Sequence, residues 1–123
     1  MKNTFKMLSL SLLICLCVPL LAFAKEGMGK IGGDNNSAIL RYTYDDDSYA
    51  VNEWKQVWDN WYYFGEDGIS KQNTWAEIDG KWYYFDEWSR MLHDTTTPDG
   101  YYVGPDGAWV KDGRVVVEAV TNN

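Results

Sequence analysis

Cysteine is almost absent from this chain, and both of its cysteines lie within residues 1–24. This segment contains two lysines, then an apolar run, then the triplet Ala-Phe-Ala, which are the three parts of a secretory signal peptide and its cleavage site. The apolar run is short for a membrane-spanning helix. We therefore predict that residues 1–24 are a cleaved signal peptide, and that the rest of the chain is secreted with neither a disulfide nor a free thiol.

Histidine is equally scarce, since His93 is the single one in the sequence. One histidine and no exported cysteine exclude a metal cluster built from these residues. The adjacent Asp94 is poorly placed to form a catalytic relay with His93. The acidic residues fall in turns, and no long loop is available to enclose a substrate. We predict that the chain is not an enzyme and has no cofactor and no metal.

Positive charge is also in short supply. The chain has 18 acidic and 11 basic residues, and two of the basic residues belong to the signal peptide. Nucleic acids and anionic membrane surfaces are bound through basic patches. The charge therefore argues against nucleic acid as a partner and, once the signal peptide is removed, against a membrane. Cationic and neutral ligands are compatible with it.

Residues 25–48 have little apolar patterning. They are rich in glycine, asparagine and charge, and we predict that they form a flexible linker segment. The alternation in residues 39–44 would suit a strand, but three consecutive aspartates at 45–47 end it. The ligand spacing of a calcium loop is missing from this run, so a solvated turn is predicted there.

Aromatic residues, by contrast, are abundant and recur at regular intervals. The segment "EWKQVWDNWYYFGEDGIS" (53–70) aligns with "TWAEIDGKWYYFDEWSRM" (74–91) at an offset of 21, and a third copy follows at an offset of 18. A period of about 20 residues indicates stacked supersecondary units, each too small to bury its own apolar face. We predict three repeats, at residues 49–70, 71–91 and 92–112.

Each repeat is predicted to be a β-hairpin. Residues 75–78 and 82–85 are short aromatic or β-branched runs, and Asp79-Gly80 between them is the preferred two-residue type I′ turn. One more hairpin, around an Asp112-Gly113 turn, is expected at the end, where residues 113–123 form a C-terminal strand and tail that covers the open edge of the stack. The predicted fold class is therefore all-β, with stacked hairpins that form a short β-solenoid.

At these residues the sequence resembles a known family. The pattern W-x(6)-WYYF-D-x-x-G-x-M is similar to the choline-binding, or cell-wall-binding, repeat of Gram-positive surface proteins, and residues 91–110 resemble the closing repeat of such arrays. The resemblance implies that choline groups of teichoic acid are held between consecutive hairpins. It also implies a cage of two tryptophans from one repeat, an aromatic residue from the next and often a methionine. Related repeats in glucan-binding proteins bind sugars instead.

Carried over position by position, the resemblance implies two ligand sites. The first predicted site consists of Trp54, Trp61 and Tyr84, and the second consists of Trp75, Trp82 and Tyr102, with Met91 in the methionine column. A quaternary ammonium group cannot donate hydrogen bonds, so ring faces hold it, and a desolvated cation–π contact contributes about 2 kcal/mol or more. Strand alternation alone decides which tyrosine faces the ligand, so Tyr83 and Tyr101 stay open as alternatives.

Several positions depart from the family pattern. Ser70 stands where methionine is expected, which predicts a weaker first site, and Ser89 stands where a turn glycine is common. Gly100 replaces the strand tryptophan of the third repeat, so this repeat can complete a site but cannot begin another. We therefore expect at most two sites. Trp58 and Trp88 have no counterpart in the pattern and receive no predicted role.

Three functions are open at this stage. The chain is predicted to be a secreted module that attaches to cell-wall polymers through choline-like groups. The alternatives are a lectin-like module for glucan or another glycan, and a protein–protein adhesion scaffold with vestigial sites. So few hairpins approach the minimum of about three repeats for a stable stack. Ligand binding, or a homodimer formed through the terminal hairpin, would therefore add stability. We expect the protein at the cell surface, in association with the cell wall.

Overall fold

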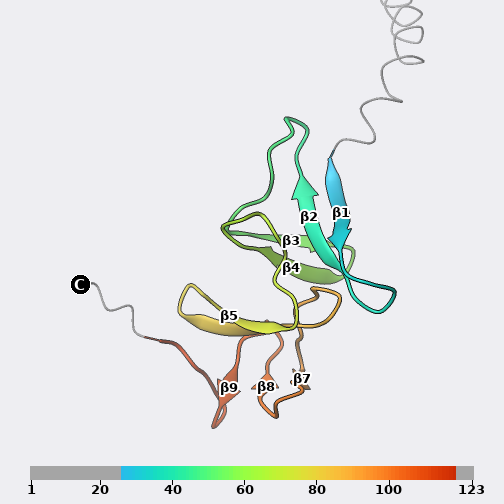
Figure 1. Ribbon diagram of the computed structural model, residues 1–123. Helices are drawn as coiled ribbons and strands as arrows, with labels where there is room; N and C mark the ends of the chain where they lie inside the picture. Colours follow the sequence, from blue (N-terminus) through green and yellow to red (C-terminus); the bar gives the residue numbers. More distant parts are fainter. Residues whose placement is uncertain (1–25, 119–123) are drawn as a thin grey trace, which may run out of the picture.

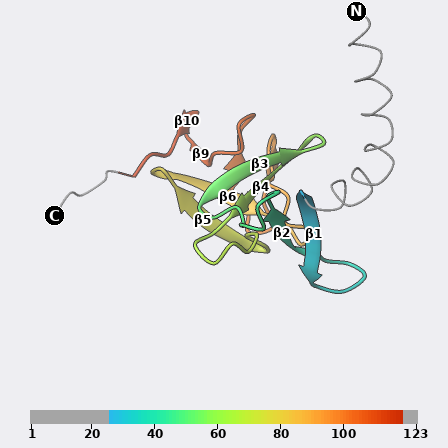
Figure 2. The ribbon, with the colours of Figure 1, turned by 90° about the horizontal axis from the view of Figure 1, so that it is seen from above.

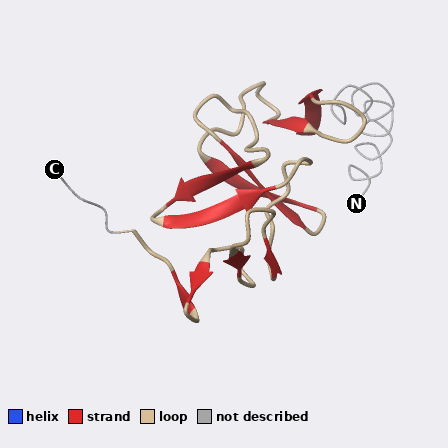
Figure 3. Cartoon of the chain, turned by 60° about the horizontal axis from the view of Figure 1, so that its bottom comes forward, coloured by secondary structure: helices blue, strands red, loops and turns tan. Residues whose placement is uncertain are grey.

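The computed structural model describes residues 26–118, which consist of strands and loops (Figures 1 and 3). The strands of these residues pair in sequence order into five two-stranded antiparallel sheets. Their bounds are β1 Gly27–Gly32, β2 Ile39–Thr43, β3 Glu53–Val57, β4 Asn60–Phe64, β5 Thr74–Ile78, β6 Lys81–Phe85, β7 Thr95–Thr96, β8 Tyr102–Val103, β9 Val110–Lys111 and β10 Arg114–Val115. The prediction of an all-β chain of hairpins is confirmed. The predicted signal peptide lies outside the described residues, and among residues 26–118 no helix has the length and apolarity that a membrane crossing needs.

The two central hairpins, β3–β4 and β5–β6, have the same register. Trp54 lies opposite Tyr63 in the first, and Trp75 lies opposite Tyr84 in the second. Asp79 and Gly80 both have positive φ angles, 52° and 81°, as a type I′ turn requires. The predicted hairpin and its turn are therefore confirmed. In β3–β4 the same turn position is held by Trp58, with φ 55° and 92% of its surface exposed.

A further hairpin precedes the predicted repeats. Strands β1 and β2 pair across residues 27–43, and Ala38 and Leu40 are buried. The prediction of a flexible segment at residues 25–48 is therefore wrong for its described part. Thr43 forms a bridge with Tyr49, six residues later, just as residues 64 and 70 do after β4. The first hairpin is thus an additional unit of the same stack.

A loop with one backbone pattern follows each of the first four hairpins, at residues 44–48, 65–69, 86–90 and 104–108. In every copy the N–H of the first residue donates to the carbonyl of the fifth, at 2.8 to 3.0 Å. The fourth residue has a positive φ in every copy: Asp47, Gly68, Ser89 and Gly107. In three copies the carboxylate of the third residue accepts the backbone N–H two positions later: Asp46, Asp67 and Asp106. The aspartate run at 45–47 is therefore part of a turn, as predicted.

Backbone hydrogen bonds tie each unit to the one before it. The N–H of Ser70 donates to the carbonyl of Leu40 at 3.0 Å, that of Met91 to Trp61 at 2.8 Å, and that of Trp109 to Trp82 at 2.8 Å. In each case the donor is the residue directly after a loop, and the acceptor lies in the second strand of the preceding hairpin. Hairpins β3–β4 and β5–β6 consequently lie one over the other, as Figures 1 and 2 show.

Two core clusters form between successive hairpins. The first core cluster lies between β1–β2 and β3–β4 and contains Ala38, Leu40, Ala50, Tyr62 and Phe64. The second core cluster lies between β3–β4 and β5–β6 and contains Ile78, Phe85 and Met91. Trp88, which had no predicted role, packs against the first core cluster from the loop after β6. It therefore covers the N-terminal units.

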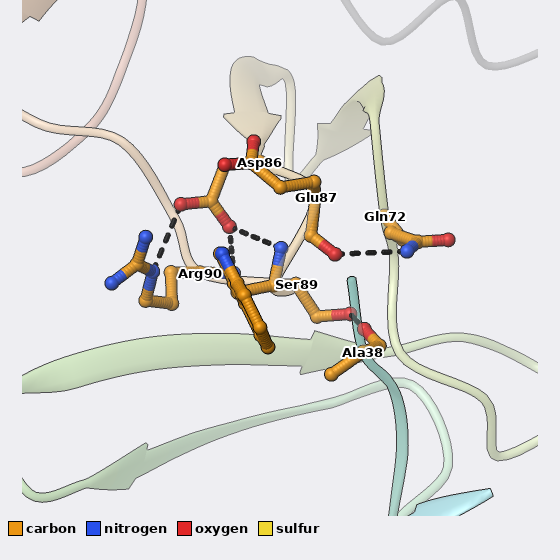
Figure 4. A network of polar contacts seen from close by, with 7 residues as sticks. Ala38, Gln72, Asp86, Glu87, Ser89 and Arg90 are labelled. Carbon is orange, nitrogen blue, oxygen red and sulfur yellow. Dashed lines mark hydrogen bonds and ion pairs between the residues drawn. The ribbon is translucent and has the colours of Figure 1, made fainter. Parts of the chain in front are cut away.

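The loop at residues 86–90 also holds the N-terminal hairpin by polar contacts (Figure 4). The Ser89 hydroxyl donates to the Ala38 carbonyl at 2.7 Å, and the Ala38 N–H donates to the Glu87 carbonyl at 2.9 Å. Asp86 accepts two backbone N–H bonds within the loop and pairs with Arg90 at 2.9 Å. Contacts thus run from one unit to the second unit after it, which stiffens a short stack.

The last hairpin of the described residues is β9–β10. Its turn residues Asp112 and Gly113 have φ 53° and 76°, so the predicted terminal hairpin is confirmed. Beyond β10, Val117 bridges Lys81, and the Glu118 N–H donates to the Gly80 carbonyl at 2.8 Å. Residues 116–118, which we name the C-terminal tail, therefore lie beside the start of β6 and pair with part of its edge.

Candidate aromatic ligand sites

The stack carries two hollows lined by aromatic rings, each between one hairpin and the next unit. We name the first hollow the first cage. It has a volume of about 560 Å³ and is walled by Trp54 and Trp61 of β3–β4, Tyr83 of β6, and Met91. Exposed side chains complete the lining: Asp59, His93, Pro105 and Asp106.

The rings of the first cage meet nearly at right angles. The Trp54 ring lies 6.2 Å from Trp61 at 85° and 4.9 Å from Tyr83 at 76°, measured between centroids. Met91 is 7% exposed whereas Trp61 is 40% exposed, so the methionine forms the buried side and Trp61 the open side. Burial raises the pKa of the Tyr83 phenol above its ordinary value.

The structure brings Tyr83, and not Tyr84, to the first cage. Tyr84 lies directly opposite Trp75 in the β5–β6 register, with ring centroids 5.4 Å apart. Residues directly opposite each other share one face of a hairpin, and successive residues of a strand alternate between faces. Tyr84 therefore faces away from Trp54 with Trp75, while Tyr83 faces toward Trp54.

Met91 also differs from its predicted placement, since it lines the first cage rather than the second. The residue at the methionine position therefore lies between its own hairpin and the preceding one. Ser70 holds the same position after β3–β4, so it lies between β1–β2 and β3–β4, where its hydroxyl accepts the Leu40 N–H at 2.8 Å. The expectation that Ser70 weakens the first site is therefore incorrect.

The second cage has a volume of about 310 Å³ and lies between β5–β6 and the last repeat. Its aromatic lining consists of Trp75, Trp82, Tyr101 and Trp109. Tyr101 stands almost perpendicular to both Trp75 and Trp109, at 87° in each case, with centroid distances of 5.9 and 5.5 Å. The second cage therefore has the same kind of walls as the first.

Tyr101 replaces the predicted Tyr102 for the same geometric reason as in the first cage. Tyr102 pairs with Thr96 and is not part of the cage lining. Trp109 was missed by the sequence reasoning, although the signal was present. It stands 18 residues after Met91, which is the offset of the third repeat, and so it holds the methionine column.

Both tryptophan walls of the second cage are bonded to carboxylates. The Trp75 indole N–H donates to Asp99 at 2.8 Å, and the Trp82 indole N–H donates to Glu118 at 3.0 Å. The Thr97 hydroxyl and the Trp75 indole hold the pKa of Asp99 below its ordinary value, so this carboxylate is charged at neutral pH. Neither acid was predicted from the sequence.

The interface between β1–β2 and β3–β4 has different walls. Met28 lies opposite Tyr42, the position that Trp54 holds in the next hairpin, and Leu40 holds the position of Trp61. Leu40 packs into the first core cluster. Because both tryptophan columns are aliphatic here, this interface lacks the aromatic walls of the two cages.

The first cage contains the single histidine of the chain. The His93 Nδ1 atom lies 2.9 Å from the Asp94 carboxylate, and both side chains are exposed. Residues 26–118 hold no group of three or more His, Cys, Asp or Glu side chains that could bind a metal ion. What the cages offer is ring faces and nearby negative charge, which suits a cationic ligand.

Comparison with known proteins agrees with this geometry. The family model for the choline-binding repeat matches residues 69–109, and that for a cell wall binding repeat matches residues 52–70. No curated protein sequence matches the chain significantly.

Solved structures give the same result. The choline binding domain of Spr1274 from Streptococcus pneumoniae is 34% identical with a TM-score of 0.55, and the match covers 65% of this chain and 92% of that one. Choline binding protein F of the same organism, crystallised in the presence of a peptidoglycan analogue, is 30% identical with a TM-score of 0.57, over 71% of this chain and 27% of that one. The modular autolysin LytC, also from S. pneumoniae, is 22% identical with a TM-score of 0.52, over 64% and 21%, and shares the fold.

The chain therefore spans most of an isolated choline binding domain but only about a quarter of the longer proteins. The matching repeats form a binding module rather than a catalytic one. The chain belongs to the choline-binding repeat family of cell-wall-binding modules.

Proposed function

We propose that the protein binds choline groups of cell-wall polymers through the first and second cages. The near-perpendicular rings carry this proposal, because three such faces surround a rounded cation from different sides. In the first cage these faces are Trp54, Trp61 and Tyr83, at 76° to 85°. The trimethylammonium group of choline has no N–H to donate, so it gains nothing from a polar pocket and about 2 kcal/mol or more from each desolvated ring contact.

Charge supports the same ligand. Asp59 and Asp106 line the first cage, and Asp99 lines the second. These carboxylates attract a cation and disfavour an anion. A crystal structure of choline binding protein F, at 30% identity, is a complex with ipratropium obtained by soaking, and ipratropium is a quaternary ammonium compound.

The proposal extends to the whole chain. Residues 1–24 direct secretion, residues 49–112 form the predicted repeats, and the described residues 113–118 contribute strand β10 and the segment that follows it. The N-terminal hairpin adds one structural unit before the two cages. The exported protein acts as a non-catalytic module that attaches to choline-bearing teichoic acid on the cell wall.

A choline titration of the exported protein tests this function. Binding to the folded state raises stability by RT ln(1 + [L]/Kd), so ligand at about 100 times Kd adds about 2.7 kcal/mol and raises the melting temperature. Tryptophan fluorescence should change with the same midpoint, and equal concentrations of sodium chloride should have neither effect. If millimolar choline changes neither the melting temperature nor the fluorescence, choline binding is refuted.

Two further comparisons sharpen the result. Trp61→Ala removes a wall of the first cage and Trp82→Ala a wall of the second, so each variant should keep one of two binding events. Retention on a choline matrix should exceed retention on a dextran matrix. The reverse order would favour glycan binding, because sugars need hydrogen-bonding side chains beside flat rings.

A further inference from the structure

The two cages hold their tryptophan walls differently. In the second cage each indole N–H is bonded to a carboxylate, Trp75 to Asp99 at 2.8 Å and Trp82 to Glu118 at 3.0 Å. Within residues 26–118, neither Trp54 nor Trp61 of the first cage has such an indole bond. The second cage is therefore built with fixed, negatively charged partners at the edges of its walls.

Backbone contacts of residues 116–118 hold Glu118 in place. Its N–H donates to the Gly80 carbonyl at 2.8 Å, and Val117 bridges Lys81. The Val116 N–H donates to the carbonyl of Trp109, another wall of the second cage, at 3.0 Å. The tail is thus bonded at three successive residues to elements that form or adjoin this cage, although its side chains are largely exposed.

Asp99 has equally defined surroundings. It lies in the turn between β7 and β8, which the Gly100 N–H closes by donating to the Thr97 carbonyl at 2.9 Å. The Thr97 side chain is 3% exposed, and its hydroxyl donates to one oxygen of Asp99 while the Trp75 indole donates to the other. The position of the Asp99 carboxylate therefore depends on the buried Thr97 as well as on Trp75.

We propose that Asp99 and Glu118 are positioning and affinity-determining residues of the second cage, and that the C-terminal tail is part of this binding site. They fix the orientation of two aromatic walls before the ligand arrives, and they place negative charge beside a cation. Pre-ordered walls reduce the ordering cost of binding, and one charge about 4 Å from a cation in a site open to water changes affinity about fivefold. This inference rests on the proposed function.

A ligand-free measurement tests the positioning directly. In ¹H–¹⁵N spectra the indole N–H groups of Trp75 and Trp82 should exchange with solvent more slowly than those of Trp54 and Trp61. Asp99→Ala should remove the protection of Trp75 alone, and Glu118→Ala or removal of residues 116–123 that of Trp82 alone. Equal, fast exchange of all four indoles in the unchanged protein would overturn the positioning role, whether or not the protein binds choline.

A binding experiment tests the effect on affinity. Trp61→Ala is used as the background, so that the second cage reports the titration. Glu118→Gln keeps an oxygen for the Trp82 indole and removes only the charge. Asp99→Asn keeps its one oxygen for the Trp75 indole and removes the charge, while its amide N–H takes the place of the oxygen that accepts from the Thr97 hydroxyl. Each variant should weaken choline binding about fivefold. Neither should weaken binding of 3,3-dimethylbutan-1-ol, the neutral isostere of choline. The alanine variants should weaken binding of both compounds.

The control variant is Glu66→Gln. Glu66 is an exposed residue that lines neither cage, so its substitution removes one negative charge outside both cages. Choline affinity should then stay within about twofold of the background protein, because water and salt screen an exposed charge that does not contact the ligand. The affinity role is overturned if Asp99→Asn and Glu118→Gln behave like Glu66→Gln. If the Trp61→Ala protein and the unchanged protein both fail to bind choline, the proposed function fails, and the indole exchange still decides the positioning role.

Discussion

Replacing Gly107 by alanine should damage the first cage from a loop that lies in another repeat. Gly107 has φ 86°, and a Cβ atom there would lie 2.4 Å from the sulfur and 2.6 Å from the methyl carbon of Met91. Met91 is 7% exposed and lines the first cage. It has little free space other than the cage itself, so the added methyl group should drive its thioether into the ligand position.

The magnitude has two parts. A side chain at positive φ costs about 1–2 kcal/mol. Overpacking a buried side chain costs about 1–3 kcal/mol, toward the lower end for methionine, whose rotatable bonds let it adapt. Gly100→Ala is the matched control, since Gly100 has φ 92° but a Cβ there would meet no atom within 4 Å. The difference between the two variants therefore measures the contact with Met91.

Urea denaturation and choline titration in a Trp82→Ala background are the two assays. Gly107→Ala should lose about 1 kcal/mol more stability than Gly100→Ala, and only Gly107→Ala should weaken binding to the first cage. Adding Met91→Ala should abolish the stability difference, because the clashing atoms are then absent. The reasoning is refuted if the two glycine variants have equal stability and bind choline equally well.

Three shorter predictions concern single side chains. Trp58→Asp should raise the free energy of unfolding in urea by about 0.5–1 kcal/mol, because Asp79 shows the residue type that tolerates this turn position, at φ 52°. In the folded protein the pKa of Asp99 lies below its ordinary value of 3.8. Its contribution to stability is therefore complete above pH 3.8 and is lost as the pH falls through the folded pKa. In acid titrations, the stabilities of the unchanged protein and Asp99→Asn should differ above the folded pKa and converge below it. Lys55→Met should lower the melting temperature through loss of about 1 kcal/mol, because the Lys55 ammonium lies 4.8 and 4.4 Å from the ring centroids of Tyr42 and Tyr44.

The repeated columns made most of the fold predictable. The WYYF tetrapeptide and the Asp79-Gly80 turn fixed the strands and register of β5–β6, and the offset of 21 transferred them to β3–β4. The β1–β2 hairpin was not predicted, because Met28 and Leu40 stand at the two positions that hold tryptophan in the other repeats. The local composition then suggested a flexible segment. Its signals were weaker, namely Tyr42 in the column of the strand tyrosines and Asp46 in the column of the loop aspartates.

The cages were predicted only in part, because alternation along one strand does not say which face meets which neighbour. The turn does supply this information. A two-residue turn at Asp79-Gly80 puts Trp75 opposite Tyr84, so these two share a face and Tyr83 must face the preceding hairpin. Asp99 and Glu118, in contrast, reach the second cage from a turn and from the C-terminal tail. No periodicity marks such contacts, so only the folded chain reveals them.

Two departures from the family pattern prove to be one feature. The residue just after one loop, which is the methionine position of the family pattern, faces the fourth residue of the next loop, which is the turn-glycine position. Met91 faces Gly107 in this way. One unit earlier the same pair is Ser70 and Ser89, whose buried hydroxyl oxygens lie 2.7 Å apart. A side chain at the turn column is thus accommodated because its partner is short. The pair also satisfies two backbone groups, since Ser70 accepts the Leu40 N–H and Ser89 donates to the Ala38 carbonyl.

This pairing predicts strong coupling between the two positions. Ser70→Met alone should clash with Ser89 and leave the Leu40 N–H without its side-chain acceptor, which together cost about 2–5 kcal/mol. Ser89→Gly alone loses a hydrogen bond but relieves a positive φ of 65°, so its effect should be smaller. The double variant restores the Met–Gly combination of Met91 and Gly107 and should be more stable than the sum of the single effects by about 1–3 kcal/mol. Denaturation of all four proteins measures this coupling, and additivity within about 0.5 kcal/mol would show that the two serines are independent.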